Sequence, residues 1–266
     1  MKRKMVWYGI LILFIAGFIS FVVGFYNALS IGVAVSQQPD PVSPAPLETP
    51  TERAEEGENM NSDGIQIMVL GDSLARGTGD PAGEGFGERV ARGLEERGQE
   101  VTLYNFAVEG MRSEALVAQL EDERILQGIR KAGCILVSIG GNDLRAVARM
   151  PLMQQDQAFE ENLRVYLDNL QQVIQQIRSV NEEALVLIIG LYNLDYSSPF
   201  DQETAYLLAW NYETQQLVET DAKAQLVPTY DLFQFKLDQY LSIDGLHPSA
   251  LGYEAMANRI LENLPE

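Results

Sequence analysis

Residues 65–73 read IQIMVLGDS, an apolar run of strand length that ends in a glycine, an acid and a serine. Four later runs share this length and apolar character, and helical patterns separate the five runs from one another. Strands that alternate with helices are typical of parallel sheets, because each strand needs a crossover before the next can start at the same edge. The sequence therefore predicts a three-layer α/β/α sandwich with a five-stranded parallel sheet, whose expected strands are 65–70, 101–107, 134–140, 184–190 and 225–230.

Amphipathic stretches between and after these runs predict helices. They cover residues 87–98, 160–180, 204–218 and 249–264, and Pro248 stands where a helix start favours proline. Right-handed crossovers then bring the carboxyl ends of all strands to one edge of the sheet. In open α/β sheets this edge is where ligands bind.

The N-terminal end combines positive charge with a long apolar run. Lys2, Arg3 and Lys4 precede an uncharged, mostly apolar segment from Met5 to Val35. At about 1.5 Å per residue this segment is long enough to cross a hydrocarbon layer of about 30 Å. Because cationic leaders stay in the cytoplasm, we expect residues 1–35 to form a basic leader and a single transmembrane helix, with the rest of the chain outside.

Cleavage of the same segment as a signal peptide is the alternative, since residues 33–36 (VAVS) would suit a signal peptidase and release a secreted protein. Residues 36–64 contain five prolines and a run of glutamates but few apolar side chains, which predicts a disordered linker. The folded domain is expected to span residues 65–266.

The composition narrows the classes of partner. The net charge is −19, and every acidic residue lies at or beyond Asp40, so the chain beyond the leader is strongly acidic. Such a surface repels nucleic acid and anionic lipid, and we expect no nucleic-acid partner. A single cysteine, Cys134, excludes an internal disulfide, and it lies in an apolar run where a small core residue is expected. The composition indicates no particular oligomeric state.

Polar residues follow the expected strands at the predicted ligand edge. Ser73 comes just after the first strand, Gly110 after the second and Asn142 after the third. Asp244 and His247 lie in the last long loop before the final helix, and His247 is the only histidine of the chain. We therefore expect these side chains, from four separate segments, to share one edge of the sheet.

These segments, in this order, resemble the conserved blocks of the SGNH hydrolases, also called the GDSL esterase/lipase family. The matching residues are GDSL at 71–74, Gly110, GGND at 140–143 and DGLHP at 244–248. The resemblance extends over about residues 65–264. It implies a flavodoxin-like SGNH hydrolase fold and a serine-type carboxylic ester hydrolase that resembles lipases and acylhydrolases and needs no cofactor.

The resemblance also implies a role for each of these residues. Ser73 would be the nucleophile, His247 the general base, and Asp244 the carboxylate that orients the imidazole. The oxyanion hole would consist of the Ser73 and Gly110 N–H groups and the Asn142 side-chain amide. The neighbouring Asp72 and Asp143 are expected to be a helix cap and a structural hydrogen-bonding residue, respectively.

Two further expectations concern substrate and metal. The loop after the fourth strand holds Tyr192 and Tyr196, which could wall an acyl pocket, although ordinary loop packing explains their presence equally well. One histidine and one cysteine form no recognisable zinc site, so no metal is expected, while calcium binding by carboxylates alone stays open.

The sequence therefore favours a membrane-tethered serine esterase or lipase that works outside the cytoplasm on carboxylic esters, with lipid acyl esters as one substrate class. The alternative within enzymes is removal of O-acetyl groups from cell-envelope polysaccharide, which a long linker would help to reach. A third hypothesis is a non-catalytic envelope binding protein that keeps only the fold.

Overall fold

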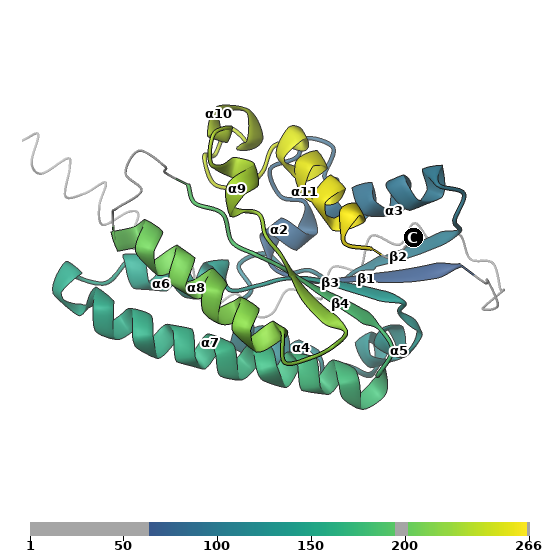
Figure 1. Cartoon of the computed structure of the whole chain (residues 1–266), viewed down its shortest axis with the longest axis horizontal. Helices are drawn as coiled ribbons and strands as arrows, with labels where there is room; N and C mark the ends of the chain where they lie inside the picture. Colours follow the sequence, from purple (N-terminus) through teal and green to yellow (C-terminus); the bar gives the residue numbers. More distant parts are fainter. Residues whose placement is uncertain (1–63, 195–201, 265–266) are drawn as a thin grey trace, which may run out of the picture. The chain divides into compact units, whose positions relative to one another are not determined.

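The computed structural model describes residues 64–194 and 202–264, which form a parallel sheet between two layers of helices (Figure 1). The sheet has five strands in the order β2-β1-β3-β4-β5, and every neighbouring pair is parallel. This is the strand order of flavodoxin-like sheets. The predicted fold of the described residues is confirmed, with strands β1 (Ile65–Gly71), β2 (Val101–Asn105), β3 (Cys134–Ser138), β4 (Leu185–Ile189) and β5 (Ala224–Val227).

The sheet has a switch point between β1 and β3. The chain passes from β1 to β2 on one side, returns to β3 on the other side of β1, and then continues outward to β4 and β5. Crossovers leave β1 and β3 toward opposite sides at this point, and in open α/β sheets ligands bind at the carboxyl ends of the strands beside such a switch point. The segments that begin at Gly71 and Ser138 therefore border the position where a ligand is expected.

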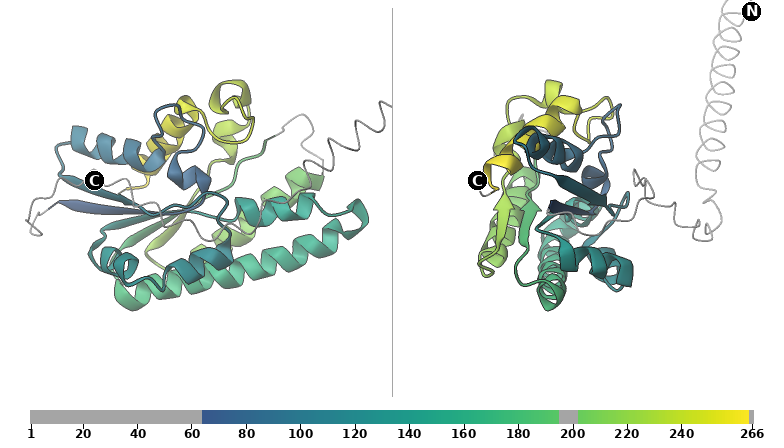
Figure 2. Two further views of the ribbon diagram at one scale, coloured as in Figure 1. Left: turned by 180° about the vertical axis from the view of Figure 1, so that it is seen from behind. Right: turned by 90° about the vertical axis from the view of Figure 1, so that its right-hand side faces the viewer.

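Helices cover both faces of the sheet (Figures 1 and 2). One layer consists of α4 (Ser113–Gln119), α5 (Glu123–Lys131), α6 (Gly141–Ala148), α7 (Leu152–Val180) and α8 (Gln202–Val218). The other layer consists of α2 (Ser73–Arg76), α3 (Phe86–Glu96), α9 (Tyr230–Phe233), α10 (Leu237–Tyr240) and α11 (Ala250–Glu262).

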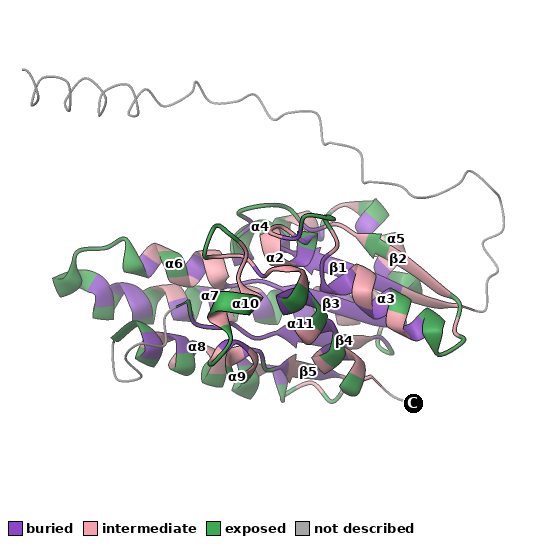
Figure 3. Cartoon of the chain, turned by 90° about the horizontal axis from the view of Figure 1, so that it is seen from above, coloured by how far each residue is buried: buried purple, intermediate pink, exposed green. Residues whose placement is uncertain are grey.

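Alternation along β1 explains how one strand serves both layers. Met68 and Leu70 belong to the core under α4–α8, whereas Ile67 and Val69 belong to the core under α3 and α11. Successive side chains of a strand point to opposite faces, so a strand covered on both sides is apolar throughout. All four side chains are fully buried, and the central strands are largely coloured as buried in Figure 3.

The sequence-based prediction made one helix too short and missed several others. The helix expected at 160–180 begins at Leu152, because its additional turns bury Phe159, which stacks on Tyr206 of α8 with ring centroids 4.3 Å apart. Helices α4, α5 and α6 were not predicted, since none exceeds nine residues and a periodic pattern is recognised only over a longer window. The last strand ends at Val227 instead of residue 230 because Pro228 has no N–H to donate to the sheet.

The predicted leader and transmembrane helix of residues 1–35, nearly all of the predicted linker of residues 36–64, and Tyr196 lie outside the described residues. Within residues 64–194 and 202–264, no helix is both long enough and apolar enough to cross a membrane.

Candidate active site

Ser73 occupies the sharp connection between β1 and α2. Gly71 ends the strand with φ +124°, and a Cβ at this position would lie 1.8 Å from the Ser138 carbonyl oxygen, so only glycine allows this approach of β1 to β3. Asp72 then caps α2, with Oδ1 accepting from the Leu74 N–H at 3.1 Å, as predicted. Ser73 is thereby the first residue of α2, at the carboxyl end of the sheet.

His247 reaches Ser73 from the loop between α10 and α11. Its Nε2 lies 2.9 Å from Ser73 Oγ, and its Nδ1 lies 2.7 Å from Asp244 Oδ2. With the ring proton on Nδ1, the imidazole donates to Asp244 and leaves Nε2 free to accept from the Ser73 hydroxyl. The structure thus brings together the three residues that the sequence predicted as nucleophile, base and orienting carboxylate.

Asp244 is held by its own loop. Its Oδ1 accepts from the N–H groups of Leu246 (2.8 Å) and His247 (2.9 Å) and from the Ser242 hydroxyl (2.8 Å). Partial burial acts to raise the pKa of Asp244, but the hydrogen bonds from His247 and these neighbours outweigh it and hold the pKa well below its usual range. The carboxylate is therefore ionised at neutral pH and suited to stabilise a positively charged His247.

Asp72 has a different environment, although it is adjacent to Ser73. Burial raises its pKa to about 6, although hydrogen bonds from the Leu74 N–H and the Ser138 hydroxyl lower it. The sequence did not predict this shift. Its one signal was Ser138 itself, a polar residue in an otherwise apolar strand, which often marks a buried polar partner.

Asn142 lies in the first turn of α6. The preceding Gly140 has φ +106°, and a Cβ there would lie 2.7 Å from the Tyr166 ring and 3.0 Å from the Trp210 indole nitrogen. This close packing fixes where α6 begins. The Asn142 side-chain amide donates one hydrogen to the Met111 carbonyl at 3.0 Å and keeps a second hydrogen for another acceptor.

The loop after β2 places Gly110 beside these groups. In this loop the Val108 N–H donates to the Gly71 carbonyl at 2.9 Å, and the Met111 carbonyl accepts from the Asn142 side chain. The loop is therefore attached both to the end of β1 and to the start of α6. Gly110 is exposed and faces open space. Among the described residues, neither the Gly110 N–H nor the Ser73 N–H has a hydrogen-bond acceptor. Both donors are therefore available to a bound molecule.

Comparison with known proteins identifies the family. The sequence profile of the GDSL-like Lipase/Acylhydrolase family matches residues 69–255, which include all the residues described above. The chain belongs to this family. It is therefore a carboxylic ester hydrolase, in agreement with the sequence-based prediction.

Individual relatives cover most of the folded domain of this GDSL family member. The spore germination lipase LipC of Bacillus licheniformis is 32% identical over 206 residues, which are 74% of this chain and 94% of LipC. The uncharacterized protein YpmR of Bacillus subtilis is 30% identical over 212 residues, or 77% of this chain and 83% of YpmR. The crystal structure of the lipase Lip_vut3 from a goat rumen metagenome superposes with a TM-score of 0.68 at 30% identity, covering 74% of this chain and 95% of Lip_vut3.

Asp143 of this GDSL family member is buried and has the predicted structural role. It accepts from the Ser113 hydroxyl at 2.7 Å and from the Ser113 N–H at 3.1 Å, and Asn169 of α7 donates to the same hydroxyl at 3.0 Å. The network links α4, α6 and α7 directly behind Asn142. Ser113 and Asn169 were not recognised in the sequence, because polar residues of helices give no signal of long-range pairing.

Tyr192 is buried beside the histidine loop. Its ring stacks on Phe233 with centroids 4.0 Å apart, and its hydroxyl donates to the Leu246 carbonyl at 2.7 Å. The residue therefore supports the backbone next to His247. Its predicted part in an acyl pocket stays a prediction, as does that of Tyr196.

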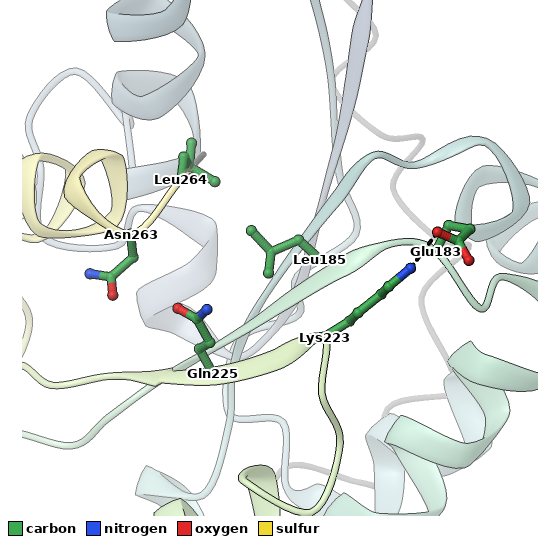
Figure 4. A pocket seen from close by; sticks show the side chains of 6 residues that line it. All are labelled: Glu183, Leu185, Lys223, Gln225, Asn263 and Leu264. Atoms are coloured by element: carbon green, nitrogen blue, oxygen red, sulfur yellow. Dashed lines mark hydrogen bonds and ion pairs between the residues drawn. The ribbon is translucent and has the colours of Figure 1, made fainter. Parts of the chain in front are cut away.

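A separate hollow of about 390 Å³ lies at the amino edge of the sheet (Figure 4). It is shallow, and its two ionisable side chains, Lys223 and Glu183, form a largely exposed ion pair with each other. None of the site residues predicted from the sequence lines this hollow, whose lining residues are Glu183, Leu185, Lys223, Gln225, Asn263 and Leu264.

Proposed function

We propose that the chain is a membrane-tethered serine esterase or lipase that hydrolyses carboxylic acyl esters outside the cytoplasm. The observation that carries the proposal is the continuous hydrogen-bonded chain from Ser73 Oγ through His247 to Asp244, with distances of 2.9 and 2.7 Å. A serine hydroxyl is a weak nucleophile on its own, and an oriented imidazole is the group that activates it near neutral pH.

The reaction proceeds through an acyl-enzyme. Ser73 Oγ attacks the ester carbonyl carbon while its proton passes to His247 Nε2, and the imidazolium is stabilised by Asp244. Collapse of the tetrahedral intermediate breaks the bond to the leaving alcohol, which takes the proton from His247. Water then attacks the acyl-serine by the same route, giving the carboxylic acid and the free Ser73 hydroxyl.

The negative charge that develops on the carbonyl oxygen needs donors that are already in place. The Ser73 and Gly110 N–H groups and the second hydrogen of the Asn142 amide fill this role in the proposal. The hydrogen bonds from Asn142 to Met111 and from Val108 to Gly71 support it, because they hold the three segments together before a substrate binds.

The proposed substrates are lipid acyl esters, including lysophospholipids. The family and two lipase relatives favour this class, and an anchor in residues 1–35 with a linker in residues 36–64 would keep the domain of residues 65–266 close to a membrane. Removal of O-acetyl groups from cell-envelope polysaccharide is the alternative that a substrate panel must test.

A fluorophosphonate probe tests the mechanism directly. The full-length protein should be labelled on Ser73 and lose activity on a simple aryl ester, whereas Ser73→Ala should show neither labelling nor turnover. Ser179→Ala is the matched control, since Ser179 is exposed on α7 and bonds only to its own helix. Failure to label the folded wild-type protein would reject the serine mechanism. Release of acetate from wall polymer, without release of fatty acid from micelles, would reject the lipid substrate.

A further inference from the structure

The connection between α6 and α7 carries apolar side chains without a packing partner. We define the α6–α7 tip as residues 149–153 (RMPLM); it projects beyond the carboxyl edge of the sheet (Figures 1 and 2). Leu152 and Met153 are 77% and 99% exposed, and Met150 is 41% exposed. Single exposed apolar residues are ordinary, but three on one short projection mark a site of interaction.

The position of the α6–α7 tip explains why these side chains cannot reach the core. Leu152 and Met153 are the first two residues of α7, and the first buried residue of this helix is Gln155. The opening turn of α7 therefore extends past the layers that cover the sheet, where folding offers it no apolar surface.

Positive charge lies next to the α6–α7 tip. Arg145 and Arg149 are four residues apart, so they share one face of α6, and both are exposed. Neither has a carboxylate partner within the described part of the chain, whereas seven other described arginines do: Arg89, Arg92, Arg124, Arg130, Arg164, Arg178 and Arg259.

Two carboxylates of these helices are already engaged, and the exposed Glu160 and Glu161 of α7 form no ion pair with Arg145 or Arg149. Asp143 is buried against Ser113, and Asp156 accepts from the side chains of Gln202 and Tyr206 on α8. In a chain with a net charge of −19, the α6–α7 tip and its two arginines thus form a local apolar and cationic surface.

We infer that the α6–α7 tip docks on an anionic lipid surface, with Leu152 and Met153 inserted at the acyl boundary and Arg145 and Arg149 at the headgroup phosphates. Apolar side chains flanked by arginines are the combination that binds the interface of anionic bilayers. Docking at this point would turn the carboxyl edge, which holds Ser73, toward the lipid. The inference rests on the proposed lipid ester substrates and adds the surface by which the enzyme reaches them.

A protein partner fits the α6–α7 tip less well. Stable protein interfaces bury about 800 Å² on each side, which is more than five residues of a narrow projection offer. Insertion into a lipid interface needs no matching surface, since headgroups and acyl chains rearrange around the inserted side chains.

A fluorescent probe at the tip tests the inference without any turnover. The only native cysteine, Cys134, is buried, and burial raises its thiol pKa to about 12, so it will not compete for a thiol-reactive dye. Met153→Cys is labelled with an environment-sensitive fluorophore in the full-length chain, which is then reconstituted into phosphatidylcholine vesicles with increasing phosphatidylglycerol. Glu182→Cys is the control, because Glu182 is exposed in the turn before β4, at the opposite edge of the sheet.

We expect a blue shift at position 153 that grows with the phosphatidylglycerol fraction, and none at position 182. Combining Arg145→Gln with Arg149→Gln should lower the ratio of docked to free domain by about thirtyfold at a given anionic content. Activity on a water-soluble aryl ester should stay unchanged in this double variant, because neither arginine belongs to the proposed catalytic groups.

Three results would overturn the inference: no shift at position 153, the same shift in pure phosphatidylcholine, or a shift without lipid that rises with protein concentration. The last would assign the tip to a second copy of the chain. The measurement is repeated with Ser73→Ala, so loss of docking and loss of esterase activity are separate outcomes and failure of one does not imply failure of the other.

Discussion

His247 Nε2 lies 2.9 Å from Ser73 Oγ, although 174 positions separate the two residues in the sequence. Ser73 is fixed by the first strand, whereas His247 depends on a loop closed by the bridge between Leu241 and Pro248 and by the Ser242 N–H bonded to the His247 carbonyl at 2.8 Å. The proposed catalytic pair is thus assembled from both ends of the folded domain, so the proposed chemistry depends on the geometry of the histidine loop.

Asp244→Asn should lower kcat by about 10²–10⁴ and leave KM nearly unchanged. The side-chain oxygen that accepts from Leu246 and His247 N–H groups can be kept by asparagine, but the group facing His247 Nδ1 loses its charge. The imidazolium formed during the reaction then lacks its counter-ion. Steady-state kinetics on a soluble aryl ester measure the effect. A variant that retains more than a tenth of the wild-type kcat would contradict the assigned role of Asp244.

Asn142→Ala should lower kcat by about 10²–10³, because one donor to the developing oxyanion is lost. Asn162→Ala is a matched control: Asn162 also donates its side-chain amide to a backbone carbonyl, that of Ala158, but within α7 and away from Ser73. Kinetics of both variants are compared with their thermal stability. Equal losses of kcat in the two would mean that Asn142 acts through folding and not at the oxyanion.

Tyr192→Phe should lower the free energy of unfolding by about 0.5–1.5 kcal/mol and reduce kcat several-fold, because the Leu246 carbonyl loses its donor and the histidine loop loosens. Tyr206→Phe is the control, since the Tyr206 hydroxyl donates to Asp156. Both residues lie in the helix layer on the other face of the sheet from the histidine loop. Urea unfolding and kinetics on esters of different acyl length distinguish support of the histidine loop from a place in the acyl pocket. A change of chain-length preference without loss of stability would place Tyr192 in the acyl pocket instead.

The strands could be predicted because each has a local signal, and the three proposed triad residues could be singled out because they stand in short motifs. Apolar runs such as residues 65–70 mark buried strands. Ser73 lies in a recognisable motif directly after the first strand, and Asp244 and His247 share a motif in the loop before the last helix. The order of the strands has no local signal: only the family resemblance implied a flavodoxin-like sheet, and the structure supplies the order itself.

The supporting contacts could not be predicted, because they join residues that are distant in the sequence. Asp143 meets Ser113 from another helix, and the Tyr192 hydroxyl meets Leu246 across 54 positions. A hydrogen-bonding side chain in a helix or loop indicates its chemistry but not its partner. The exposed first turn of α7 was missed for a related reason, since its apolar residues begin a helix before that helix reaches the core.

The pH dependence of folding should identify Asp72. Burial raises its pKa from the ordinary 3.8 to about 6, so between these values the folded protein holds a proton that the unfolded chain has released. The contribution of Asp72 to stability is therefore complete below pH 3.8 and is lost as the pH rises through 6, by an amount on the order of 3 kcal/mol. Asp244, with its lowered pKa, acts with the opposite sign and at lower pH.

Asp72→Asn removes this titration while keeping a side-chain oxygen to accept from Leu74 and Ser138. The variant should match the wild type near pH 4 and become more stable than it above pH 6, because a neutral amide is not penalised by burial. Urea unfolding of both proteins from pH 3.5 to 7.5 measures the difference, in which all other titrating groups cancel. Two curves that run parallel over this range would show that Asp72 is ionised in the folded protein at a normal pKa. A difference that opens between pH 4 and 6 would establish a buried proton one residue from Ser73.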